Sequence, residues 1–315
     1  MKTFFTILFL LILAAVAVGG YLYWEASKGA PAEAVEAQYV TDADRFIEVD
    51  GARVRVRIEG PEGAPVIILL HGFLYSLETW DVWADALSTD FRVVRYDLLG
   101  HGLTGPDAAR RYAPMERAAF LGALMEAIGV DRAAIGGNSL GGLVAWRYAS
   151  MAPERVSALV LVAPGGYSIN GVEDEPAPAP AAMKLFLKTA PEAGVKTTLE
   201  ALFEDDALVD ERRIARLRDM MRREGNGEAF IQSIEEFTLP DPQADLARIT
   251  APTLILWGDK DMLMPVDHGR MMADAIPSSE LTLYENVGHV PQEEAGAATA
   301  ADVRRFLARV HETAR

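Results

Sequence analysis

The feature that most constrains this chain is an alternation of short, continuously apolar segments with segments of helical periodicity. The apolar segments, which we expect to be strands, cover residues 65–70 (PVIILL), 92–96, 133–135 and 157–162. The helical segments between them cover residues 77–87, 114–128 and 140–150. A strand without polar alternation is buried on both faces. The pattern therefore predicts a mostly parallel sheet covered by helices on both sides.

The alternation stops between residues 165 and 247, where only helical patterns occur, and then returns. The patterns there cover residues 183–188, 196–203, 211–223 and 228–237. Strands are expected again at 253–257 and 281–284, and helices at 269–276 and 300–310. A hairpin is expected at 46–58 around Asp50-Gly51. These patterns predict an α/β core over 45–164 and 248–315, with a helical cap over 165–247 inserted after the sixth of eight strands.

The N-terminus differs from the rest of the chain, because residues 4–24 carry no charge and are apolar throughout. About twenty such residues cross a bilayer core. Residues 1–24 are either a transmembrane anchor or a signal peptide cut after Ala17; the anchor is favoured because the apolar run continues to Tyr21, Tyr23 and Trp24. Lys2 on the N-terminal flank favours a body outside the cytoplasm, periplasmic if anchored and secreted if cleaved. Residues 25–44, rich in Ala, Pro and acids, are expected to be a linker.

Charge and cysteine content exclude several classes of function. The formal net charge is −16, so the chain repels phosphate backbones and nucleic acid is not an expected partner. There are no cysteines, which excludes disulfides, thiolate metal sites and a cysteine nucleophile. No histidine cluster has metal-ligand spacing, and no P-loop or dinucleotide fingerprint occurs. We therefore expect neither a metal nor a cofactor.

Ser139 stands in Gly137-Asn138-Ser139-Leu140-Gly141, between an apolar segment and a helical one. A serine on a sharp strand-to-helix turn needs small neighbours so that the backbone can fold tightly. This context predicts that Ser139 is a nucleophile. His71-Gly72-Phe73 directly follows the strand at 65–70. The N–H groups of Phe73 and Leu140 would form an oxyanion hole, and His71 would shape the loop.

An acid and a base follow in the chain order Ser…Asp…His. Asp261 and Asp259 both follow the strand at 253–257, and Asp261 is preferred because Asp259 beside Gly258 suits a turn. His289, on the loop after the strand at 281–284, is the expected general base. The remaining histidines are poorer candidates: His101, His268 and His311.

With these residues in hand, the chain resembles the α/β-hydrolase superfamily over residues 46–310. The matching segments are His71-Gly72, 96–102 (YDLLGHG), 137–142 (GNSLGG), 256–261 (LWGDKD) and Gly288-His289. The resemblance implies Ser139 as nucleophile, Asp261 as acid, His289 as base, Phe73 and Leu140 as oxyanion donors, and a structural role for Asp97.

Departures from the superfamily's subgroups narrow the expected activity. A serine at position 139 argues against dehalogenases and epoxide hydrolases, which use Asp, and Phe73-Leu74-Tyr75-Ser76 replaces the Gly-Pro-rich loop of meta-cleavage-product hydrolases. What remains resembles the bacterial lipases and esterases that have an N-terminal hydrophobic segment, similar to membrane-anchored monoacylglycerol lipases. We therefore expect a small-molecule ester or lipid as substrate.

Two alternatives stay open: a C–C hydrolase or haloperoxidase that uses the same triad, and a non-catalytic binding module. Five cap residues are candidate acyl-chain contacts or plain cap core: Leu185, Phe186, Leu199, Leu202 and Phe203.

Overall fold

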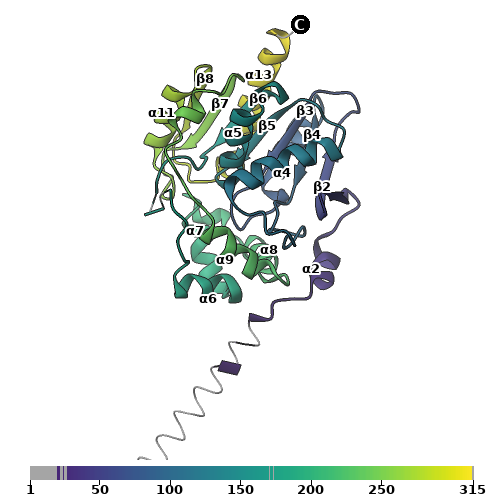
Figure 1. The fold of residues 1–315 in the computed structure, drawn as a ribbon, viewed down its shortest axis with the longest axis vertical. Helices are drawn as coiled ribbons and strands as arrows, with labels where there is room; N and C mark the ends of the chain where they lie inside the picture. Colours follow the sequence, from purple (N-terminus) through teal and green to yellow (C-terminus); the bar gives the residue numbers. More distant parts are fainter. Residues whose placement is uncertain (1–19, 22–23, 25–26, 170, 173, 314–315) are drawn as a thin grey trace, which may run out of the picture.

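The protein is built on one eight-stranded sheet, and Figure 1 shows it with β8 toward one side and β2 toward the other. The computed structural model describes residues 20–21, 24, 27–169, 171–172 and 174–313. The strand order is β1-β2-β4-β3-β5-β6-β7-β8. The pairs β1–β2 and β2–β4 are antiparallel, and all other pairs are parallel. This confirms the predicted mostly parallel sheet of eight strands.

The first two strands form at the predicted hairpin, and the other six form at the predicted apolar segments. Their bounds are Asp44–Val49 (β1), Ala52–Glu59 (β2), Val66–Leu70 (β3), Arg92–Tyr96 (β4), Ala133–Asn138 (β5), Val156–Val162 (β6), Thr253–Gly258 (β7) and Ser279–Tyr284 (β8). Every residue of β5 and β7 is buried, as expected for central strands covered on both faces. The antiparallel hairpin β1–β2 turns at Asp50-Gly51, with Val49 paired to Ala52.

Helices cover both faces of the sheet. One face packs on helices α4 (Pro114–Ala127), α5 (Leu140–Met151) and α11 (Val266–Ala275). The other packs on α3 (Asp81–Leu87) and the C-terminal helix α13 (Gly296–Thr313). Short helical segments complete the core: η1 (Leu77–Trp80), η2 (Pro153–Arg155), α10 (Gln243–Leu246) and α12 (Pro291–Glu294). Trp80 and Trp83 are fully buried against the second face.

A helical cap is inserted between β6 and β7 and lies beyond one end of the sheet (Figure 1). Its elements are α6 (Ala181–Thr189), α7 (Glu192–Glu200), η3 (Asp206–Leu208), α8 (Glu211–Arg222) and α9 (Asn226–Glu235). The cap has its own apolar core, which also takes in Leu74 and Val290 from the loops after β3 and β8. The cap is thereby packed on the carboxyl ends of the strands.

Residues 25–44, expected to be a linker, include a helix and a sheet residue. Helix α2 (Ala32–Tyr39) buries Val35 against Leu103 and Met220. The Tyr39 hydroxyl donates a hydrogen bond to Asp219 of α8 at 2.7 Å. Asp44, the last residue of the segment expected to be a linker, is instead the first residue of strand β1. The Ala-, Pro- and acid-rich composition gave no sign of this packing, because the partners of the segment lie far along the chain.

The apolar N-terminal segment, residues 4–24, falls almost wholly outside the described residues. Within the part of the chain that the structure describes, no helix combines the length and apolarity needed to cross a membrane. Tyr21 and Trp24, two of the three aromatic residues expected at a membrane interface, are exposed.

Candidate active site

Ser139 sits at the turn between β5 and α5 with a backbone that few non-glycine residues adopt. Its φ is 52° and its ψ is −114°. The turn is tight: a Cβ on Gly137 would lie 2.3 Å from the Gly141 carbonyl oxygen, and a Cβ on Gly141 would lie 2.1 Å from that of Leu70. Glycine is required at both positions. Strain of this kind persists only where the surroundings enforce it, and it is typical of functional residues.

Asp261 and His289 are hydrogen-bonded, with Asp261 Oδ2 2.8 Å from His289 Nδ1. The other carboxylate oxygen of Asp261 accepts hydrogen bonds from the N–H groups of Leu263 and Met264, at 2.9 and 2.8 Å. With Nδ1–H donated to Asp261, His289 Nε2 is left as an acceptor. That atom is buried and has no hydrogen-bond partner among the described residues. The arrangement leaves it free to accept a proton.

Asp259, the competing acid, has a different role. Its carboxylate accepts a hydrogen bond from the Asn286 N–H at 2.6 Å and pairs with Lys260 at 2.9 Å. It therefore connects the residues after β7 to the loop that carries His289. The structure brings Asp261, and not Asp259, to the imidazole.

The residues expected to form an oxyanion hole flank Ser139. Phe73 lines the same cavity as Ser139 and His289. Its neighbour Leu74 has a φ of 67°, so this loop is held in an uncommon conformation. Leu140 is the first residue of α5, and its N–H therefore has no acceptor within the helix.

The loop of His289 is fixed by contacts that the sequence did not reveal. The His289 N–H donates to the Leu202 carbonyl of the cap at 2.8 Å. The Asn138 side-chain amide donates to the carbonyls of His289 (3.2 Å) and Val162 (3.1 Å). The carboxylate of Glu294 accepts from the N–H groups of Gly288, Glu204 and Asp205. Asn138 stood within the nucleophile motif, whereas nothing in the sequence around Glu294 pointed to this role.

Two of the other histidines, His71 and His101, lie in settings that do not suit a base. His71 is fully buried; its Nε2 accepts from the Leu98 N–H at 2.9 Å, and its Nδ1 lies 2.7 Å from the Gly72 carbonyl oxygen. Burial lowers the pKa of His71 to about 4, so it is neutral and shapes the loop as expected. Burial also lowers the pKa of His101 well below its ordinary value.

Asp97 is part of the buried framework below this loop. Its carboxylate accepts from the N–H groups of Leu77 and Leu103 at 2.8 and 2.7 Å, and it lies 3.3 Å from the Arg55 guanidinium. These contacts match the structural role that the resemblance implies.

The cavity beside Ser139 is small, with a volume of about 110 Å³. It is lined mostly by apolar residues: Gly72, Phe73, Leu74, Tyr75, Asn138, Ser139, Thr198, Leu202, Leu217, Leu263, His289 and Val290. Of the five cap residues considered as acyl contacts, Leu202 lines it, and Leu199 lines a smaller adjoining hollow that shares Leu74, Tyr75 and Leu217. Leu185 is exposed, and Phe186 and Phe203 pack in the cap core.

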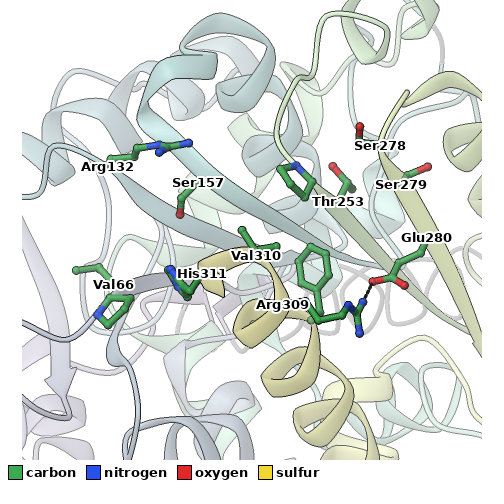
Figure 2. Close-up of a pocket in the computed structure, with 13 residues that line it drawn as sticks. Val66, Arg132, Ser157, Thr253, Ser278, Ser279, Glu280, Arg309, Val310 and His311 are labelled. Carbon is green, nitrogen blue, oxygen red and sulfur yellow. Dashed lines mark hydrogen bonds and ion pairs between the residues drawn. The ribbon is translucent and has the colours of Figure 1, made fainter. Parts of the chain in front are cut away.

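A larger hollow of about 720 Å³ lies at the opposite end of the sheet, where the parallel strands begin (Figure 2). It is bordered by Val66, Thr253 and Ser279 at the amino ends of parallel strands, and by Arg309 and His311 of α13. Ser139 follows the carboxyl end of β5, so this hollow belongs to the other end of the fold. None of the predicted site residues lines it.

The fold and the site together define a hydrolase. The chain belongs to the family described as "alpha/beta hydrolase fold", which matches residues 65–296.

Three similar proteins illustrate the range of this family. The dihydrolipoyllysine-residue acetyltransferase component of the acetoin cleaving system of Pseudomonas putida is 31% identical, over 84% of this chain and 69% of that protein. The 2-hydroxy-6-oxo-6-phenylhexa-2,4-dienoate hydrolase of Burkholderia cepacia is 25% identical, over 83% and 93%. A crystal structure described as a membrane phospholipase A, a novel bacterial virulence factor, superimposes with a TM-score of 0.70 at 26% identity, covering 99% of both chains.

Proposed function

We propose that the protein hydrolyses carboxylic esters through an acyl-enzyme on Ser139, with His289 as general base and Asp261 as the acid that orients it. The observation that carries this proposal is the Asp261–His289 pair: His289 lines the same apolar cavity as Ser139, and its buried Nε2 has no hydrogen-bond partner among the described residues. Nucleophile, base and orienting acid in this arrangement are the parts that acyl transfer requires.

In the proposed reaction, the Ser139 hydroxyl proton passes to His289 Nε2 as Oγ attacks the ester carbonyl. The N–H groups of Phe73 and Leu140 stabilise the oxyanion, and such a donor is worth about 3–4 kcal/mol. The tetrahedral intermediate collapses, and the alcohol leaves with the proton from His289. Water then gives a proton to His289 and attacks the acyl-enzyme; the second tetrahedral intermediate collapses, the acid leaves, and His289 returns the proton to Ser139 Oγ.

The size of the cavity favours a short acyl group. An apolar cavity of about 150 Å³ holds a six-carbon ring, so about 110 Å³ has room for roughly four carbon atoms. Longer chains would need Leu217 and its neighbours to move. The lining contains no Lys or Arg among the described residues, which favours an uncharged acyl group.

A fluorophosphonate probe and a series of p-nitrophenyl esters test this proposal. The probe should label the full-length protein and fail to label the Ser139→Ala variant. Ester turnover should be highest for short acyl chains and fall with length. A wild-type protein that the probe does not label would contradict the proposal and favour a non-catalytic binding module.

A C–C hydrolase remains the second candidate, since the Burkholderia cepacia relative is named for cleaving a dienoate. Such a substrate carries a carboxylate, for which the described cavity lining offers no cationic partner. Cleavage of a vinylogous diketone in the absence of any ester turnover would favour this candidate over the esterase.

We also propose that residues 4–24 anchor the protein in a membrane, with the catalytic body outside the cytoplasm. The uncharged apolar run supports this, as does the likeness to a membrane phospholipase A across 99% of both chains. An anchored protein resists extraction by alkaline carbonate and keeps its N-terminal segment. A mature protein that starts at Val18 would instead be secreted.

A further inference from the structure

The cap helix α6 turns an apolar side to solvent. Four of its nine residues are exposed: Ala181, Ala182, Met183 and Leu185. Leu185 is 48% exposed and Met183 is 40% exposed. The solvent side of a surface helix is ordinarily charged or polar, and a group of exposed apolar side chains marks a surface that binds a partner. We call these four residues the α6 face.

The two lysines of α6 are held by the neighbouring helix. Lys184 Nζ lies 2.6 Å from Glu235, and Lys188 Nζ lies 2.9 Å from Glu228, so both pair with acids of α9. These contacts fix α6 on the cap with its apolar side outward. Every exposed residue from 176 to 185 is uncharged, which extends the apolar surface to the segment before the helix.

The chain that follows the apolar N-terminal segment joins the cap beside α6. The Ala30 N–H donates to the Arg222 carbonyl at 2.5 Å, and the Glu224 N–H donates to the Ala30 carbonyl at 2.8 Å. Residues 27–29 line one cavity together with Lys188 of α6. Figure 1 shows α6 and this stretch of chain at the same end of the molecule, away from the C-terminus.

The apolar run therefore ends close to the α6 face. Trp24, its last residue, is 54% exposed. The four residues from Trp24 to Lys28 span at most about 14 Å. Lys28 lines the same cavity as Lys188, which is about one helical turn from Leu185. Aromatic residues at the end of a membrane segment lie at the level of the headgroups. An anchor formed by residues 4–24 would thus hold α6 near the bilayer surface.

We propose that the α6 face lies on the surface of the bilayer that holds the N-terminal segment, with Met183 and Leu185 between the headgroups. Apolar side chains on one side of a surface helix enter this region of a bilayer. The face is small, but a tethered contact forms at a high effective concentration, so a weak intrinsic affinity is sufficient. The inference rests on the proposed membrane anchorage, and not on the proposed chemistry at Ser139.

Spin labels test this contact, because the chain has no cysteine and a single introduced one can be labelled. Leu185→Cys and Met183→Cys each place a nitroxide on the α6 face. Met151→Cys is the matched control, since Met151 is 46% exposed at the end of α5. The full-length proteins are reconstituted into liposomes of phosphatidylcholine and phosphatidylglycerol. Electron paramagnetic resonance then measures collisions with oxygen, which concentrates in lipid, and with a nickel chelate, which stays in water.

We expect the ratio of oxygen to nickel collisions to be severalfold higher at residues 183 and 185 than at residue 151. Because the contact is apolar, this ratio should persist at high salt and in liposomes without phosphatidylglycerol. Loss of the high ratio under either condition would show that the contact is electrostatic, and would contradict the proposal.

Three further results would overturn the inference. Nickel collisions as frequent at residues 183 and 185 as at residue 151, in a protein that floats with the liposomes, would place the α6 face in water while the anchorage stands. Protection from both oxygen and nickel would mean that protein covers the face, as in a pair of copies of this chain. A protein that does not float with the liposomes would contradict the anchorage and this inference together. All three substitutions change exposed side chains, so the fold is preserved.

Discussion

His289 Nδ1 lies 2.8 Å from Asp261 Oδ2, while Nε2 on the far side of the same ring has no partner among the described residues. One nitrogen is thus fixed by a carboxylate whose second oxygen is itself held by two backbone N–H groups. The ring is oriented, and its tautomer is set, before any substrate arrives.

Asp261→Asn should therefore lower the kcat of ester hydrolysis by about 10⁴-fold, because an amide would favour the wrong imidazole tautomer. Asp259→Asn is the matched control, since that carboxylate contacts Asn286 and Lys260 rather than the ring. Steady-state kinetics on one short-chain ester measures both. A comparable loss in the two variants would contradict the assignment of Asp261.

Leu217→Ala should shift the preferred acyl chain to greater length. Leu217 lines both the cavity of Ser139 and the adjoining hollow bordered by Leu199, so shortening it joins the two spaces. The kcat/KM for six- to eight-carbon esters should rise relative to acetate. Leu187→Ala, which removes the same atoms from the cap core away from both cavities, should leave the ratio unchanged.

Stability should decline as the pH falls from about 6.5 to about 4, in part through His71. Burial lowers the pKa of His71 from 6.5 to about 4, so the unfolded state takes up the proton first as the pH falls. A group whose folded pKa is depressed contributes stability above its unfolded pKa and loses it toward its folded pKa. The loss from this group is up to about 3 kcal/mol. Urea unfolding from about pH 7 to about pH 4 measures the free energy of unfolding, which should decline less in His71→Gln than in the wild type. An equal decline in the two proteins would show that protonation of His71 is not the cause.

Asp44→Asn should lower the free energy of unfolding by about 3 kcal/mol, because it removes a buried carboxylate that the guanidinium groups of both Arg55 and Arg57 contact. Asp44 Oδ1 lies 2.7 Å from Arg55 Nε and 2.8 Å from Arg57 Nε, and its side chain is fully buried. Denaturant unfolding measures the loss. Asp42→Asn, at an exposed position two residues earlier, should have little effect.

Asp44 also illustrates how much the sequence could predict. The apolar runs located the central strands because burial on both faces leaves a local signature, the Asp50-Gly51 turn located the hairpin β1–β2, and Ser139 could be found because its turn demands glycine neighbours. Asp44 gave no such signal: its partners lie 11 and 13 residues away in a different strand, and its neighbours resemble a spacer. Glu294 could not be found for the same reason, since it acts on Gly288 and on two cap residues about 90 positions earlier. Contacts between distant segments leave little trace in local composition.

The hydrogen bond from the His289 N–H to the Leu202 carbonyl has a consequence for the timing of the reaction. The His289 backbone is thus held by the cap, and Glu294 connects the His289 loop to the cap a second time, through Gly288 and Glu204. A cap that swings outward around α7 would pull on the peptide that carries the imidazole. An open cap would then admit a bulky substrate but displace His289, and a closed cap would hold His289 in place but block entry. In each turnover the cap would have to close before the reaction could start.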